Sequence, residues 1–185
     1  MSFGAPKGPQ GPKAPRPRRT RALKPQEPID DAKAAFAAAL RLLGYRARSR
    51  QELHQRLVQK GYTEGAADAA IARAEAAGFI DDRAHAQRLG QRAQQTKLLG
   101  ARGARFYLRR MGIEEAQAEE ALREYDEEGA ARRLAEKKLA SMKGLPEEVK
   151  RKRLASALGR RGFSSTTVSR CLRESKEAGG SKEED

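Results

Sequence analysis

The sequence is short of the residues that hold most small proteins together. It has one cysteine in 185 residues, so an internal disulfide framework is excluded, as suits a reducing cytoplasm. Aromatic residues make up 5% and tryptophan is absent, which argues against a single large core. No apolar run approaches the roughly twenty residues of a membrane span, and the N-terminus lacks the apolar core of a signal peptide. We therefore expect a cytoplasmic protein without a membrane segment, built from several small units.

The chain also lacks an assembled catalytic constellation. Its two histidines, His54 and His85, stand apart from any motif, and Cys171 has no CxxC partner. The Asp81-Asp82 pair follows a glycine and two apolar residues, so a helix cap explains it better than a metal or acid pair. The glycines that begin at Gly100 lack the GK[ST] sequence of a phosphate-binding loop. We predict no enzymatic activity, no metal and no cofactor.

Positive charge is the strongest compositional feature. The 39 Lys and Arg residues against 25 Asp and Glu residues give a formal net charge of +14. This balance favours a polyanionic partner, although a solvated basic face on a helical protein fits the composition as well. Seven of the eight prolines lie in residues 1–28, where no acid precedes Glu27. Residues 1–29 are therefore expected to form a disordered basic arm, either touching nucleic acid or acting as a solubilising leader.

A helix–turn–helix pattern organises the chain around Gly61. Ser49 and Glu52 have the spacing of a capping box, in which Ser49 accepts from the amide three residues on and Glu52 reaches back. Gly61 follows the apolar face of this helix, where a left-handed stop favours glycine, and Thr63 can cap the next helix. The candidate caps of the flanking helices are Asp30 or Asp31 and Asp81 or Asp82.

The pattern occurs three times. The stop glycines lie at 61, 112 and 162, which are 51 and 50 residues apart, and four further columns match, including Leu57, Leu108 and Leu158. We predict an all-α fold of tandem three-helix, helix-turn-helix-like repeats that form an elongated curved array. The expected repeats span 30–78, 79–126 and 127–175, followed by a disordered tail over 176–185. About nine helices are expected, near 30–44, 50–60, 64–77, 82–97, 101–111, 114–125, 127–142, 146–161 and 164–175.

Basic residues cluster on the second helices of the middle and last repeats. In the middle repeat three arginines fall at i, i+3 and i+7, so they share one ridge and can follow a phosphate backbone together. In the last repeat, residues 141–173 hold nine basic and two acidic groups. A solvated helix face is the competing interpretation. The candidate residues for binding nucleic acid or its protein filament are Arg102, Arg105, Arg109, Arg110, Lys150, Arg151, Lys152, Arg153, Arg160 and Arg161.

The sequence resembles the RecX regulatory proteins of bacteria over about residues 32–173. The resemblance rests on an RSxxEL helix from Arg48 to Leu53, on Gly61-Tyr62, on Gly78-Phe79-Ile80-Asp81-Asp82, and on Gly100, Arg105, Leu108 and Gly112-Ile113. It implies a modular all-α fold and a cytoplasmic regulator of the RecA recombinase. RecX-like proteins are thought to lie in the groove of the filament that RecA forms on single-stranded DNA, and there to inhibit strand exchange and ATP hydrolysis.

The resemblance implies RecA as the partner, with single-stranded DNA, and also duplex DNA as a further candidate, bound largely without sequence preference. A self-contained array is expected to be a monomer. Two positions depart from the family pattern. His85 stands where an aromatic residue is usual, and Gly100-Ala101 replaces Gly-Pro, which predicts a looser helix start.

A stand-alone helix-turn-helix protein that reads duplex DNA is the alternative. Recognition helices of that kind carry Asn, Gln or Arg near the N-terminus. The third helices of the repeats begin Glu64-Gly65-Ala66, Glu114-Glu115-Ala116 and Ser165-Thr166-Thr167. The first two beginnings argue against groove reading, and only the third is suited to it.

Overall fold

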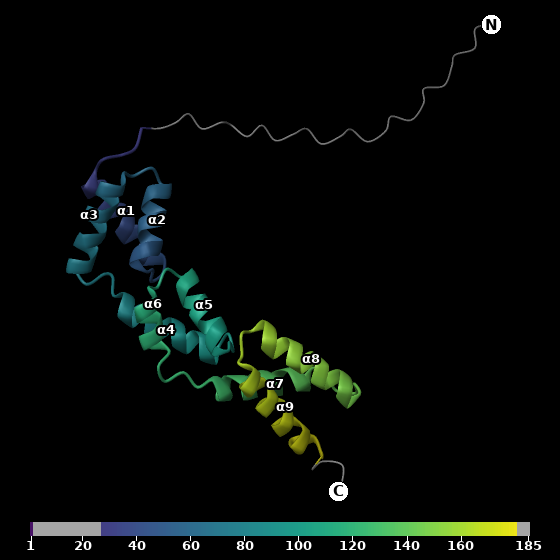
Figure 1. The fold of residues 1–185 in the computed structure, drawn as a ribbon. Coiled ribbons are helices and arrows are strands. Elements are labelled where there is room, and N and C mark those ends of the chain that lie inside the picture. Colours follow the sequence, from purple (N-terminus) through teal and green to yellow (C-terminus); the bar gives the residue numbers. More distant parts are fainter. Residues whose placement is uncertain (2–26, 181–185) are drawn as a thin grey trace.

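The computed structural model describes Met1 and residues 27–180, with side chains to residue 177, and this part of the chain is a curved array of helices (Figure 1). It has no strand, only one isolated bridge between Ile29 and Tyr62. The described residues form α1 (Ala32–Tyr45), α2 (Arg50–Gln59), α3 (Glu64–Ala76), α4 (Asp82–Gln95), α5 (Ala101–Arg110), α6 (Glu115–Ala121), α7 (Glu127–Ala140), α8 (Glu147–Arg160) and α9 (Ser165–Gly180). The expectation of an all-α repeat fold is confirmed.

Successive triplets of helices each surround a separate hydrophobic cluster. The leucine column supplies the centre of each, because Leu57, Leu108 and Leu158 are all fully buried in their own clusters. Alanine fills much of the remaining space, as in the first cluster, where α1 and α3 pack closely through small side chains. Small cores of this kind depend on stacking against neighbours for stability.

The three stop glycines end their helices in the predicted left-handed conformation. Gly61, Gly112 and Gly162 have φ angles of +93°, +78° and +77°. At each site the next residue's amide donates to the leucine carbonyl five residues back, at 3.2 Å, 3.1 Å and 3.4 Å. This is the Schellman arrangement, which satisfies a carbonyl that the helix leaves free.

The N-caps resolve two open choices and correct one expectation. Asp31 caps α1 and Asp81 caps α4, in both cases by accepting from amides of the first turn. Ser49 accepts from the Glu52 amide at 3.1 Å, as predicted. The reciprocal half of the capping box is wrong, because the Glu52 carboxylate instead meets Arg46 and Arg48. Two nearby guanidinium groups attract the carboxylate more strongly than one neutral amide.

The ends of the described chain are more ordered than the sequence indicates. Ile29, expected in the arm, donates to the Gly61 carbonyl at 2.7 Å and accepts from the Thr63 amide at 3.0 Å. The rest of the expected arm, residues 2–26, lies outside the described residues. Helix α9 continues to Gly180 instead of ending near residue 175, and the last tail residues, 181–185, again lie outside the described part.

The second helices of the repeats, α8, α5 and α2, meet end to end (Figure 1). The Gly100 amide at the start of α5 donates to the Arg161 carbonyl at the end of α8, at 2.9 Å. At the equivalent place one repeat earlier, Ser49 Oγ at the start of α2 donates to the Met111 carbonyl at the end of α5, at 2.7 Å. We call these three helices the second-helix row. A Cβ on Gly103 would overlap the Arg161 carbonyl, so the α8–α5 contact admits no side chain there.

Carboxylates at the start of the next repeat hold the row in place. Asp82, the first residue of α4, accepts from the Arg50 amide of α2 at 3.0 Å. Glu127, the first residue of α7, accepts from the Ala101 amide of α5 at 3.0 Å. The looser helix start predicted for Gly100-Ala101 is therefore wrong, since alanine has the N–H that this hydrogen bond needs and proline lacks it.

Candidate nucleic-acid interface

The arginines of α5 divide into a paired and an unpaired set. Arg105 Nε and Arg109 Nε lie 3.6 Å and 3.5 Å from the two carboxylate oxygens of Glu115, at the start of α6. Arg102 and Arg110 are exposed and form no ion pair with any described residue. The predicted ridge is thus divided, because Glu115 pairs with two of its members and offsets one of their two charges. The unpaired charges lie two turns apart, on the face opposite the buried Leu108.

The cations of α8 also differ in their surroundings. Lys150 Nζ lies 2.6 Å from Glu147 and Lys152 Nζ lies 3.9 Å from Glu148, so the first turn of the helix partly neutralises the basic run. Arg151, Arg153 and Arg160 are exposed and have no ion-pair partner among the described residues.

Arg161 has a structural role. Its guanidinium is partly buried and donates to the carbonyls of Lys97 and Leu98, in the connection between α4 and α5. These bonds occupy donors that a phosphate would need, and they tie the last repeat to the middle one. Arg161 is therefore less suited to nucleic acid than its neighbour Arg160.

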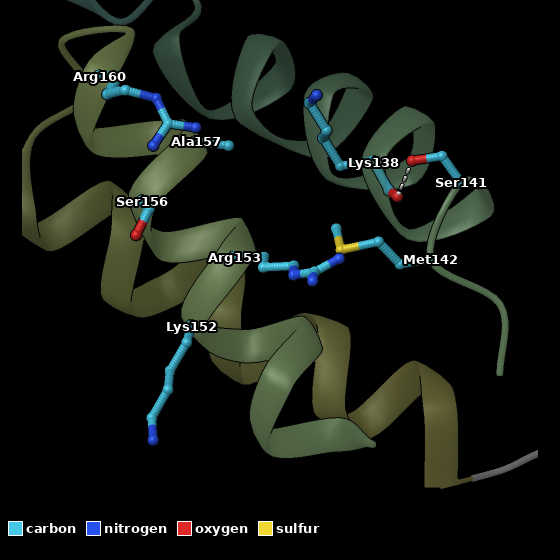
Figure 2. A pocket seen from close by; sticks show the side chains of 8 residues that line it. All are labelled: Lys138, Ser141, Met142, Lys152, Arg153, Ser156, Ala157 and Arg160. Atoms are coloured by element: carbon cyan, nitrogen blue, oxygen red, sulfur yellow. Dashed lines mark hydrogen bonds between the residues drawn. The ribbon is translucent and has the colours of Figure 1, made fainter. Parts of the chain in front are cut away.

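A basic pocket of about 480 Å³ opens between α7 and α8 (Figure 2). Four of its lining residues are cations and none is acidic. Arg153 extends from α8 into the space between the helices, whereas Lys152 points outward (Figure 2). The lining residues are Lys138, Ser141, Met142, Lys152, Arg153, Ser156, Ala157 and Arg160. The excess of cations along this wall attracts anionic groups such as phosphate.

Two residues that line the pocket were not among the candidates predicted from the sequence. Lys138 and Ser141 come from the end of α7 and the turn after it, outside the basic runs of the second helices. Ala157, which also lines the pocket, occupies the column that holds Tyr107 in the middle repeat, where the ring lies 4.8 Å from Lys97 Nζ. The Lys137-Lys138 pair near the end of a helix was the only sequence signal for this wall.

The remaining reactive groups are held in structural settings. Burial raises the pKa of the Cys171 thiol, whose Sγ lies 3.8 Å from the Ala131 carbonyl. A protonated, buried thiol is a poor nucleophile. The described residues contain no group of three or more His, Cys, Asp or Glu that could hold a metal ion. Within the same residues, no helix is long and apolar enough to cross a membrane.

His85 is buried, at 7% exposure, where the family pattern has an aromatic residue. Desolvation lowers its pKa, and the charges of Arg88 and Arg46 lower it further while Glu52 raises it. Its Nε2 atom has no hydrogen-bond partner in the described structure. The side chain therefore acts as a neutral packing group between the first two repeats.

The fold and its surface define an all-α protein of tandem three-helix repeats with unpaired cations on its second helices. Two family models match it, "RecX, first three-helix domain" over residues 35–73 and "RecX, third three-helix domain" over residues 126–172. The chain belongs to the RecX family of regulatory proteins.

Similar proteins cover most of the chain. The regulatory protein RecX of Pelodictyon phaeoclathratiforme is 33% identical over 144 residues, which is 78% of this chain and 90% of that protein. The Streptomyces coelicolor regulatory protein RecX is 33% identical over 159 residues, 84% and 83% of the two chains. The crystal structure of RecX from Lactobacillus salivarius superposes with a TM-score of 0.68 at 24% identity, over 78% of this chain and 96% of that one, and this likeness supports the fold.

Proposed function

We propose that this protein is a non-enzymatic regulator that binds the RecA–single-stranded-DNA filament and inhibits its ATP hydrolysis and strand exchange. Membership of the RecX family, at 33% identity over 78% of the chain, is the observation that carries this proposal. The family resemblance implies RecA as the partner, and recombination and DNA repair as the setting. A cytoplasmic monomer is the form in which we expect it to act.

The distribution of charge supports contact with a polyanion. Five of the predicted candidate residues are exposed and have no ion-pair partner in the described residues, namely Arg102, Arg110, Arg151, Arg153 and Arg160. A repeat array presents such groups along an extended surface, which suits a filament better than a compact ligand. Phosphate contacts carry no sequence information, so the binding to DNA should be non-specific and steeply dependent on salt.

Titration of the protein into a RecA reaction tests the proposal directly. RecA, single-stranded circular DNA and ATP are held constant while ATP hydrolysis and strand exchange are followed. Both rates should fall as the protein is added, at ratios well below one protein per RecA subunit if each copy spans neighbouring subunits. Unchanged rates at every ratio would remove the proposed function.

A matched pair of charge variants tests the surface. The double variant Arg102→Ala and Arg110→Ala removes two unpaired cations of α5. The control Arg83→Ala and Arg132→Ala removes two exposed arginines that do form ion pairs, Arg83 with Glu120 of α6 and Arg132 with Glu128 of α7 and Glu174 of α9. Both variants lose two positive charges. If each α5 arginine meets one phosphate, the first variant should lower the salt slope for single-stranded DNA by about 1.4, and the control should leave it unchanged. Equal slopes would mean that only net charge matters.

A further inference from the structure

Exposed residues occupy corresponding positions on the three helices of the second-helix row. The repeat columns place Lys152, Ser156 and Arg160 of α8, Arg102, Phe106 and Arg110 of α5, and Gln51, Gln55 and Gln59 of α2 in corresponding positions. All nine are exposed and none is acidic. Because α8 meets α5 and α5 meets α2 through equivalent contacts, the three sets follow one another along the row. We call these nine residues the row stripe.

Phe106 gives the row stripe its chemical character. Its side chain is 67% exposed, although the hydrophobic cluster of its own repeat lies on the other side of α5. Arg102 lies one turn before it and Arg110 one turn after it, and neither has an ion-pair partner among the described residues. An exposed aromatic ring between two free guanidinium groups is the arrangement that binds unpaired bases, with the ring under a base and the cations on neighbouring phosphates.

We propose that the row stripe binds single-stranded nucleic acid, with a base stacked on Phe106 and phosphates on the cations of α5 and α8. A duplex fits less well, because its bases are already stacked and an aromatic face would find no partner. The glutamines of α2 continue the stripe without charge, so the strand is held most strongly over α8 and α5. The basic pocket between α7 and α8 lies at the charged end, since Lys152, Ser156 and Arg160 belong to both surfaces. This inference deepens the nucleic-acid part of the proposed function and rests on it.

Binding of two labelled strands by the purified protein without RecA tests the stacking. One strand is an oligothymidine of thirty nucleotides, and the other is an abasic strand with the same number of phosphates. The wild-type protein should prefer the thymidine strand. Phe106→Ala should weaken thymidine binding about fivefold to a hundredfold and abolish the preference, as expected for the loss of one stacked base. Its salt slope should stay unchanged, because no phosphate contact is lost.

Phe79→Ala is the matched control, because Phe79 is 55% exposed but lies between α3 and α4, outside the row stripe. It should bind both strands like the wild type. The inference is overturned if Phe106→Ala keeps the preference for bases. It is also overturned if that variant keeps strand binding but loses inhibition of RecA, since Phe106 would then contact protein. If Phe106→Ala loses the base preference while the wild type does not inhibit RecA, the stripe stands and the proposed function fails.

Discussion

Substituting alanine for Gly103 should destabilise the protein, although the same change stabilises an ordinary helix. Gly103 lies in the first turn of α5 with a negative φ, so alanine fits its backbone and would bring a helix-propensity gain of about 0.5–1 kcal/mol. The new Cβ, however, would overlap the Arg161 carbonyl oxygen and lie 3.1 Å from its carbonyl carbon. Both atoms belong to backbone at the end of α8 and cannot rotate away.

The size of the destabilisation can be estimated from the separation of α5 and α8 that the new Cβ requires. Overpacking a close contact costs about 1–3 kcal/mol. Separating the two helices also breaks the 2.9 Å hydrogen bond from the Gly100 amide to the same carbonyl, which is worth about 1 kcal/mol. After subtracting the propensity gain, Gly103→Ala should lower the free energy of unfolding by about 1–3 kcal/mol.

Gly65→Ala is the matched comparison. Gly65 also lies in the first turn of a helix, and a Cβ there would meet nothing within 4 Å. This variant should gain up to about 1 kcal/mol. Urea unfolding followed by circular dichroism should therefore move the two midpoints in opposite directions, by about 1 M in total for a typical slope of 1–3 kcal/mol/M. If both midpoints rise together, α5 and α8 do not meet as closely as described.

Two further substitutions test single side chains in the same unfolding assay. Glu127→Ala should lower the free energy of unfolding by about 1–3 kcal/mol, because Glu127 accepts from the amides that begin α5 and α9. The control Glu128→Ala removes only exposed ion pairs and should cost under about 1 kcal/mol. Equal losses would contradict the capping role. Burial lowers the pKa of His85 in the folded protein, whereas in the unfolded chain the pKa has its ordinary value of 6.5. As the pH drops from 7.5 to 5.5, the unfolded state therefore takes up more protons than the folded state, and the free energy of unfolding should fall. His85→Gln should reduce that fall while His54 remains in both proteins, and an identical pH dependence would show that His85 does not contribute.

Local signals in the sequence predict most of the fold. The stop at Gly61 and the cap at Ser49 depend on residues within one or two turns, and the structure has both. Ion pairs between helices depend instead on how the helices pack in space. Glu115 lies in a different helix from Arg105 and Arg109, and no periodicity shows that its carboxylate reaches both.

The candidate site was predictable only as a list of cations. Sequence identified Arg160 and Arg161 together, but their side chains lie in different surroundings, because Arg160 is exposed and Arg161 contacts the connection between α4 and α5. Phe106 belongs to no motif of the sequence, and only its exposure in the folded chain marks it out. Whether a charged group lacks an ion-pair partner, or an aromatic ring is exposed, depends on how the helices pack, so both can be identified only from the structure.

The end-to-end arrangement of α8, α5 and α2 has an electrostatic consequence for anything that lies along it. Each helix carries about half a positive charge at its N-terminus and half a negative charge at its C-terminus. Where the Arg161 carbonyl meets the Gly100 amide, and where the Met111 carbonyl meets Ser49, opposite partial charges face each other and cancel. At these two points a positive helix end offsets the negative one, so a chain of phosphates that passes them is repelled less than it would be at an isolated C-terminus.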